Sequence, residues 1–171
     1  AVPAILFSLI VELILDVPIS QFVAPAGAIA ADLLGVAVVA PIAEEIFKGL
    51  ALVLLWLFFR HEIDSPLDGI IYGGLIGFGF ATVENIFYFT STFLESGLGG
   101  VVFLSLFRAV IFGLNHALFT GLTGLGLALA RTSASWPVKL GAPVVGLGAG
   151  VMTHAIHNGS VTLGSTLCWP C

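Results

Sequence analysis

Charged residues are scarce in this sequence. Only 9% of its 171 residues are charged, whereas 58% are hydrophobic, and the mean hydropathy is +1.14. A soluble domain of this size carries charge on roughly a quarter of its residues, so the composition excludes an ordinary soluble domain and indicates an integral membrane protein. Positive charge is the scarcer sign, with five Lys and Arg against ten Asp and Glu, which leaves no basic patch for nucleic acid.

Cysteine and nucleophile motifs are also nearly absent. The only two cysteines, Cys168 and Cys171, form Cys-Trp-Pro-Cys at the end of the chain. A C-x-x-C pair can be a redox pair or half of a zinc site, but no second pair and no βαβ pattern accompany it. We therefore expect an incidental or disulfide-bonded terminus without a catalytic role. The G-x-S-x-G motif of serine hydrolases is missing, and Asp68, although followed by glycine, stands at a helix start, where we expect it to cap the helix.

Long apolar runs dominate the sequence instead. Five stand out, in chain order Val2–Leu15, Leu33–Phe59, Leu67–Leu94, Val101–Ala130 and Val138–Leu167. The last four exceed the roughly 20 residues that a helix needs to cross a bilayer, and the first is short for a span. We predict an all-α, polytopic transmembrane helix bundle of about five membrane segments, forming one integral-membrane domain over residues 1–171. Asp16–Asp32 would be an external loop or a re-entrant segment.

The few basic residues predict the orientation. Arg60 follows the second apolar run, and Arg131 and Lys139 flank the loop after the fourth, whereas residues 16–32 and 95–100 contain no Lys or Arg. By the positive-inside rule the basic loops are cytoplasmic and the C-terminus is extracytoplasmic, in a multi-pass protein of the cell membrane. No basic segment precedes the first apolar run, so we expect no signal peptide and a chain that is a truncated or minimal core.

Glycine recurs at four-residue intervals. Gly69, Gly73 and Gly77 share one face of the third run, and Gly146 and Gly150 do so in the fifth. Small residues at this spacing let helix backbones approach closely in lipid. We expect these glycines to join helices and other residues to carry the chemistry.

Charge does occur within the second apolar run. Glu44, Glu45 and Lys48 lie inside it, and each ionised group near a helix centre costs roughly 2.5–3.5 kcal/mol on insertion. Lys48 can pair with either carboxylate because the spacings are i,i+4 and i,i+3. One lysine cannot neutralise two glutamates, and Glu84 adds a third, so we favour a functional cluster over a self-neutralising structural pair.

Polar groups from four different helices share one depth. At 1.5 Å of rise per residue, all lie roughly 14 to 22 Å from the outer ends of their runs. These residues are Glu44, Glu84, His116, His154 and Asn158. A shared layer predicts a single site.

The residue types in this layer suit water activation. His154, His157 and Asn158 stand at i, i+3 and i+4, which places at least the first and last on one helix face. Two histidines a turn apart can ligate one metal with a glutamate from another helix, or a histidine and an amide can hold an oxyanion. His116 is a candidate ligand or base, with an interhelical hydrogen bond as the structural alternative. Arg108 is either a counter-ion of the carboxylates or a side chain that snorkels outward.

The whole set of motifs resembles one known family. The motifs are Glu44-Glu45-x-x-Lys48, Asp68-Gly-x-x-Tyr72, Phe80-x-x-x-Glu84-Asn85, Arg108 with His116, and His154-x-x-His157-Asn158. Together they resemble the PrsW family of intramembrane proteases, and more distantly the CAAX-processing and bacteriocin-processing membrane proteases. The resemblance implies cleavage of membrane-anchored proteins, such as an anti-sigma factor, at a site on the outer side of the membrane. PrsW relatives are classed as presumed metalloproteases, whereas the CAAX-type relatives activate water through glutamate without metal.

The resemblance also assigns roles by position. The candidate catalytic residues are Glu44, Glu45, Glu84, His116, His154 and Asn158. We predict an intramembrane endopeptidase in which glutamate and histidine, or a metal that they bind, activate the water. The expected metal is zinc, held by Glu84, His116 and His154, and a metal-free glutamate mechanism is the alternative. The partners expected are the lipid bilayer and a membrane-anchored protein substrate.

Two other function classes are compatible with buried charge. A proton- or ion-coupled transporter also needs Glu, Lys and His in the membrane. Many transporters carry internal repeats, and no convincing repeat relates the halves of this sequence, which weakens that alternative. A non-catalytic membrane adaptor would retain its function in Glu45→Gln.

Overall fold

All regular elements in the described part of the chain are helices. The computed structural model describes residues 33–59, 61 and 63–168. The elements are the π-helices η2 (Gly35–Val39) and η3 (Leu106–Ile111), and the α-helices α3 (Ala40–Phe58), α4 (Pro66–Ser105), α5 (Asn115–Thr132) and α6 (Trp136–Cys168). The predicted all-α class is confirmed for these ranges. The expected first segment Val2–Leu15, the stretch Asp16–Asp32 and Cys171 lie outside the described residues.

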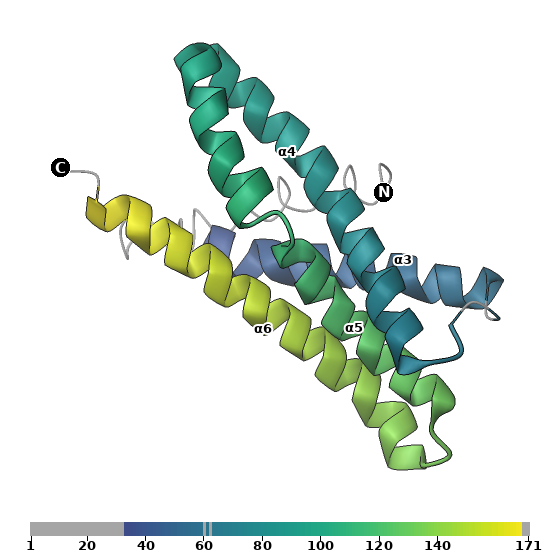
Figure 1. Ribbon diagram of the computed structural model, residues 1–171. Coiled ribbons are helices and arrows are strands. Elements are labelled where there is room, and N and C mark those ends of the chain that lie inside the picture. Colours follow the sequence, from purple (N-terminus) through teal and green to yellow (C-terminus); the bar gives the residue numbers. More distant parts are fainter. Residues whose placement is uncertain (1–32, 60, 62, 169–171) are drawn as a thin grey trace.

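Helix α4 begins at a capping box and contains a sharp turn. The Ser65 side chain accepts a hydrogen bond from the Asp68 backbone N–H, and the Asp68 carboxylate accepts one from the Ser65 N–H. The capping role expected for Asp68 is therefore confirmed. Further along, Gly97 has a φ of 65°, which favours glycine over residues with a Cβ, and the chain doubles back there, as the hairpin at the top of Figure 1 shows.

The apolar run expected at Val101–Ala130 is interrupted in its middle. Helix η3 ends at Ile111 and α5 begins at Asn115, so residues 112–114 separate two helical pieces. The Phe112 N–H donates to Phe107 O at 2.8 Å, a wide π-type turn. The Asn115 N–H then donates to Phe112 O at 3.0 Å, a tight three-residue turn. Apolar side chains continue through the break, so hydropathy alone does not detect it.

Helices α4, α5 and α6 pack in sequence, and α3 crosses all three. Figure 1 shows α5 between α4 and α6, with α3 running behind them, and α3 contacts each of the three. Glycines on α4 face α5 backbone: a Cβ at Gly73 would lie 2.5 Å from Thr120 O, and one at Gly77 would collide with His116 O. A Cβ at Gly146 of α6 would likewise lie 2.7 Å from Leu122 O. The predicted joining role of these glycines is confirmed, and Gly77 brings α4 against the backbone of a site histidine.

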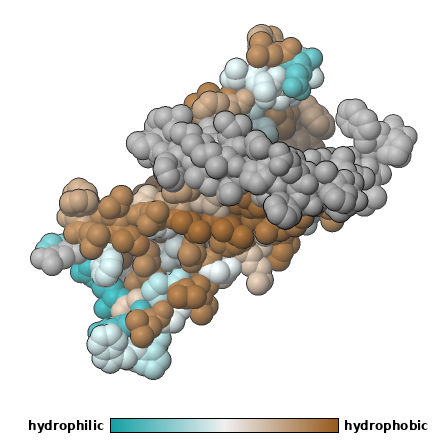
Figure 2. Space-filling view, turned by 180° about the vertical axis from the view of Figure 1, so that it is seen from behind, coloured by the Kyte–Doolittle hydropathy of each residue, from teal (hydrophilic) through white to brown (hydrophobic). Residues whose placement is uncertain are grey.

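The surface outside the helix contacts is largely hydrophobic. Within the described residues, two helical stretches, Pro66–Thr132 and Trp136–Gly164, are long and apolar enough to cross a membrane. Large apolar side chains of α3, including Leu54, Leu57 and Phe58, are exposed. On the face in Figure 2, hydrophilic residues gather at two ends, the Gly97 turn and the α5–α6 connection, with hydrophobic surface between them. This distribution fits helices surrounded by lipid.

Candidate active site

The charged residues of α3 form a buried cluster. Glu45 and Lys48 are 0% and 1% exposed, and Glu44 is also buried. The Lys48 ammonium donates to Glu44 Oε2 at 2.9 Å and to Glu45 Oε1 at 2.8 Å. It also lies 4.0 Å above the centre of the Phe80 ring of α4. The predicted pairing of one lysine with both carboxylates is present, and it leaves one negative charge in excess.

Glu45 is fully enclosed by hydrogen-bond donors from three helices. Besides Lys48, the Thr120 hydroxyl of α5 donates to Glu45 Oε2 at 3.1 Å, and His154 Nδ1 of α6 lies 3.1 Å from Glu45 Oε1. Because a carboxylate accepts and does not donate, the proton of His154 is on Nδ1. In the neutral ring the other nitrogen, Nε2, has a free lone pair, and it lies 3.9 Å from Glu44 Oε2.

His116 of α5 connects this cluster to Glu84 of α4. Its Nδ1 lies 3.0 Å from Lys48 Nζ, and its Nε2 lies 3.3 Å from Glu84 Oε2. An ammonium only donates, so Nδ1 accepts, and the neutral ring carries its proton on Nε2, the nitrogen that faces Glu84. The ring also packs edge-on against Phe119, with centroids 5.7 Å apart. Both nitrogens of His116 are thus engaged within the site.

Arg108 of η3 is the counter-ion of Glu84. Its guanidinium lies 2.9 Å from Glu84 Oε2, and its Nε donates to Asn85 Oδ1 at 2.9 Å. The guanidinium also stacks 3.6 Å from the centre of the Tyr88 ring. Of the two alternatives left open for this arginine, the structure shows the inward, paired one.

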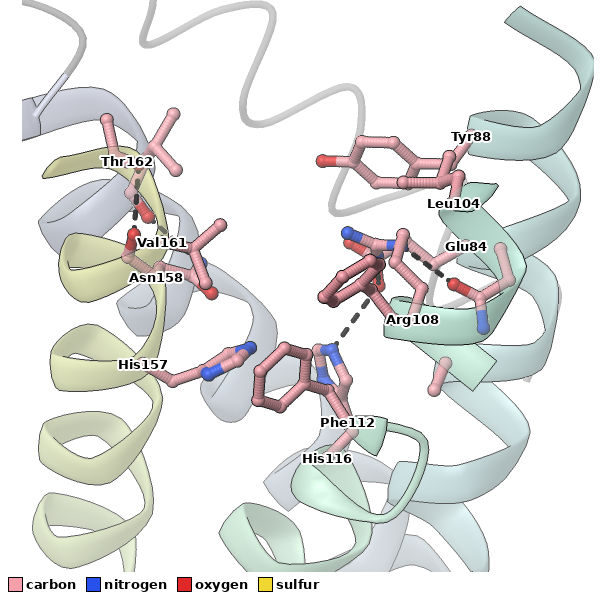
Figure 3. Close-up of a pocket in the computed structure, with 14 residues that line it drawn as sticks. Glu84, Tyr88, Leu104, Arg108, Phe112, His116, His157, Asn158, Val161 and Thr162 are labelled. Atoms are coloured by element: carbon pink, nitrogen blue, oxygen red, sulfur yellow. Dashed lines mark hydrogen bonds and ion pairs between the residues drawn. The ribbon is translucent and has the colours of Figure 1, made fainter. Parts of the chain in front are cut away.

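A cavity of about 410 Å³ opens beside Glu84 and His116. Its wall is mostly apolar and comes from η2, α4, η3, the 112–114 break, α5 and α6. The side chains with polar groups that line it are Glu84, Asn85, Tyr88, Arg108, His116, His157, Asn158 and Thr162. Figure 3 shows Glu84 and Arg108 on one side, His157 and Asn158 of α6 on the other, and His116 with Phe112 between them. The cavity therefore reaches the edge of the charged cluster.

Two polar residues of α6 face this cavity rather than the cluster. Asn158 donates from Nδ2 to Val36 O of η2 at 3.0 Å, so its amide is tied to backbone. His157 Nδ1 lies 3.2 Å from Asn115 Nδ2, and its ring packs on Phe112 with centroids 5.1 Å apart. The predicted site residue Asn158 thus shares the cavity with Glu84 and His116 but has no hydrogen bond to the carboxylates.

Three described residues can converge on one metal ion. One ligand atom from each of Glu44, His116 and His154 lies within 4.8 Å of the others, and Glu44 Oε2 is 3.9 Å from both His116 Nδ1 and His154 Nε2. Tetrahedral zinc needs ligand atoms roughly 3.3 Å apart, and two imidazoles with one carboxylate are a zinc-binding set. The residue types therefore fit zinc, and binding would require the ligand atoms to move closer together and the Lys48 ammonium to leave Glu44 Oε2 and His116 Nδ1.

In the structure, Glu44 rather than Glu84 lies with the two histidines as a candidate metal ligand. Of the predicted ligands Glu84, His116 and His154, both histidines belong to the convergent group, whereas Glu84 contacts His116 and pairs with Arg108. Sequence reasoning gave no role to Thr120, which donates to Glu45. The sequence signal that could have identified Thr120 is its spacing, since Thr120 follows His116 by four residues and so lies on the same helix face.

Comparisons with known proteins identify the family of the chain. The family model described as PrsW family intramembrane metalloprotease matches residues 1–170. The chain is 33% identical over 97 residues to "Protease PrsW" of Oceanobacillus iheyensis, an alignment that covers 56% of this chain and 40% of that protein. It is 32% identical over 92 residues to "Protease PrsW" of Geobacillus kaustophilus, covering 54% and 37% of the two chains.

A further relative aligns over a longer stretch. "Protease PrsW" of Halalkalibacterium halodurans is 28% identical over 123 residues, which covers 71% of this chain and 52% of that protein. These alignments span about half or less of each relative's length. No solved structure matches the chain.

Proposed function

The chain belongs to the PrsW family of intramembrane metalloproteases, and from this premise we propose that it is an intramembrane endopeptidase that cleaves membrane-anchored proteins. One observation carries the proposal: a buried cluster of carboxylates and imidazoles meets a cavity of about 410 Å³ through Glu84 and His116. Proteolysis needs a water, a base and a space for the peptide. The cavity provides the space, and Glu84 in its wall can act as the base.

The remaining features of the proposal come from the sequence. We propose one integral-membrane domain over residues 1–171, with about five membrane segments in the cell membrane and an extracytoplasmic C-terminus. The distribution of basic residues supports this orientation, and the depth of the polar layer supports cleavage near the outer membrane face. The family resemblance supports an anti-sigma-factor-like substrate.

We assign the zinc ligands to Glu44, His116 and His154. A zinc ion held there would act as a Lewis acid toward the scissile carbonyl and its attacking water. Glu45 is a positioning residue in this assignment, because it accepts a hydrogen bond from His154 Nδ1 and so directs Nε2 toward Glu44. Carboxylates commonly orient metal-binding histidines in this way.

Glu84 is the proposed proton acceptor. It lines the cavity, and the nearby Arg108 guanidinium keeps its carboxylate ionised, which is the form that accepts a proton. As the water oxygen bonds to the carbonyl carbon, a water proton passes to Glu84. When the C–N bond then breaks, Glu84 returns this proton to the leaving amine. A general base typically contributes about 10²–10⁴-fold to the rate.

The test combines cleavage with metal content. Purified protein is incubated with a single-span reporter substrate, with and without chelator, and zinc is quantified per chain. We expect about one zinc per chain, activity that chelator removes and zinc restores, and loss of both zinc and activity in Glu44→Gln. Glu95→Gln is the matched control, because Glu95 is exposed on α4.

Two results would revise the proposal in different ways. Cleavage without metal that still requires Glu44 would assign the chain to the glutamate-dependent class, with Lys48 as the permanent cation of the cluster. No cleavage of any reporter would reject the protease function.

A further inference from the structure

His157 lines the cavity and has no part in the mechanism above. Figure 3 places it on α6, across the cavity from Glu84 and beside His116 and Phe112. A peptide lying between these walls would have Glu84 on one side and His157 on the other. If Glu84 activates a water on its side, the carbonyl oxygen, where negative charge develops, would be on the side of His157.

The ring of His157 is held in one orientation. Asn115, the first residue of α5, contacts its Nδ1 at 3.2 Å. Phe112 and Phe119 flank the ring, with centroid separations of 5.1 and 6.0 Å. A donor that is fixed before the reaction stabilises a developing oxyanion without reorganising, which is the main source of its effect.

The contact with Asn115 also determines the tautomer. Its amide nitrogen, the atom that faces the ring, can only donate, so Nδ1 accepts and the neutral ring carries its proton on Nε2. The Nε2–H has no hydrogen-bond partner among the described residues. It is a donor available to a ligand in the cavity.

Asn158 is less well placed for the same task. Its amide already donates to Val36 O at 3.0 Å, which ties the side chain to the η2 backbone. We propose that His157 is the hydrogen-bond donor to the carbonyl oxygen of the scissile peptide, and that Asn115 is the positioning residue that keeps its proton on Nε2. This inference rests on the proposed protease function.

The kinetic test replaces the donor and then restores it. In the full chain, His157→Phe keeps a flat ring and removes the N–H, so we expect kcat to fall about 10²–10³-fold with little change in KM. His157→Gln restores an N–H and should recover part of kcat. Ser160→Ala is the control, since Ser160 is exposed on the same helix and, among the described residues, its hydroxyl donates to Ile156 O of its own helix.

Affinity measurements separate this role from simple packing. A peptidyl difluoromethyl ketone binds as its hydrated, tetrahedral form, whereas an uncleaved peptide amide of the same sequence mimics the ground state. We expect His157→Phe to weaken binding of the ketone by about the same factor by which kcat falls, and to leave binding of the amide nearly unchanged. Equal weakening of both ligands would show a packing role and overturn the inference.

The tautomer gives a readout that does not depend on activity. In histidine-labelled protein, the ring ¹⁵N and ¹³C shifts of His157, assigned by their loss in His157→Phe, should report a proton on Nε2. Asn115→Asp should move this proton to Nδ1 and reduce kcat while the imidazole stays in place. If His157→Phe does not fold, Asn115→Asp tests the inference in its place.

The outcomes distinguish the two proposals. If wild-type protein cleaves and both His157→Phe and Asn115→Asp stay within threefold of it, the inference is wrong and the protease function stands. A wild-type proton on Nδ1 also overturns the inference. If wild-type protein cleaves no reporter, the proposed function fails, and the donor role fails with it.

Discussion

Lys48→Met removes the cation from the most buried part of the site. The ammonium is 1% exposed and lies within 3.0 Å of Glu44, Glu45 and His116. Methionine has a similar length and fills the same space, so the main change is the loss of charge. Removing one partner of a buried ion pair costs about 3–5 kcal/mol, because the other charge stays buried without compensation. Two carboxylates lose their partner here, so we expect the upper part of that range.

The same variant should respond more strongly to zinc. Without Lys48 the α3 carboxylates carry two uncompensated charges, and no ammonium competes for Glu44 Oε2 or His116 Nδ1. We expect zinc to bind the variant at least tenfold more tightly than the wild type, which is about 1.4 kcal/mol. A ligand at 100 times its Kd stabilises the folded state by about 2.7 kcal/mol, so zinc should recover much of the loss.

Unfolding in mixed micelles, followed by circular dichroism over a detergent titration, measures both effects. Lys139→Met is the control, because Lys139 is the other lysine of the chain and is exposed on α6. A loss of less than about 1 kcal/mol in Lys48→Met would refute the reasoning, since that is the size of an exposed ion pair. Equal zinc stabilisation of wild type and variant would show that the metal does not bind at Glu44.

Three further variants probe other contacts of the site. Gly77→Ala should destabilise the fold by about 1–3 kcal/mol in thermal melts, because the added Cβ meets α5 backbone. Gly99→Ala is the control, since nothing lies near the position of its Cβ. Equal melting temperatures of the two variants would contradict the close packing at Gly77. Arg108→Leu removes the counter-ion of Glu84 and should lower kcat at least tenfold in the reporter assay, and unchanged kcat would exclude a role for the pair. Glu45→Gln should weaken zinc binding about 10–100-fold by equilibrium dialysis, because the α6 ligand loses its orienting carboxylate.

The meeting of polar residues from several helices follows from the sequence. Apolar run lengths give the depth of each residue, since a helix rises a constant distance per residue and the bilayer thickness is nearly constant. Glu44, Glu84, His116, His154 and Asn158 are assigned to one layer on that basis. In the structure a chain of contacts joins the first four, from Glu84 to His116, Glu44 and His154, whereas Asn158 lines the same cavity as Glu84 and His116 and donates to Val36 O. The spacing of the glycines likewise predicts which face of α4 packs closely against another helix, and in the structure that helix is α5.

The pairing of these residues does not follow from the sequence. Which carboxylate faces which histidine depends on the rotation of each helix about its axis, and one residue changes that rotation by 100°. The break at residues 112–114 resets the rotation between Arg108 and His116. It lies among apolar residues with one glycine, Gly113, and so gives no hydropathy signal. The contact of Asn158 with the π-helical backbone at Val36 also depends on helix rotation, and hydropathy does not distinguish a π-helix from an α-helix, so the sequence does not predict it.

The turn at Gly97 and the break at residues 112–114 bound a short arm, residues 98–111, that carries Arg108. Glu84 belongs to the longer part of α4, before the turn, so the ion pair between these two residues joins the arm to the body of the molecule. Two further contacts of the same side chain do so too, because the Arg108 Nε donates to Asn85 Oδ1 at 2.9 Å and the guanidinium stacks on the Tyr88 ring. Moving the arm away from Glu84 would separate the two charges, and the free-energy cost of that separation is larger in surroundings of low polarity. Leu104 and Phe107 of the arm line the cavity, so the side chain of Arg108 also holds this part of the cavity wall in place.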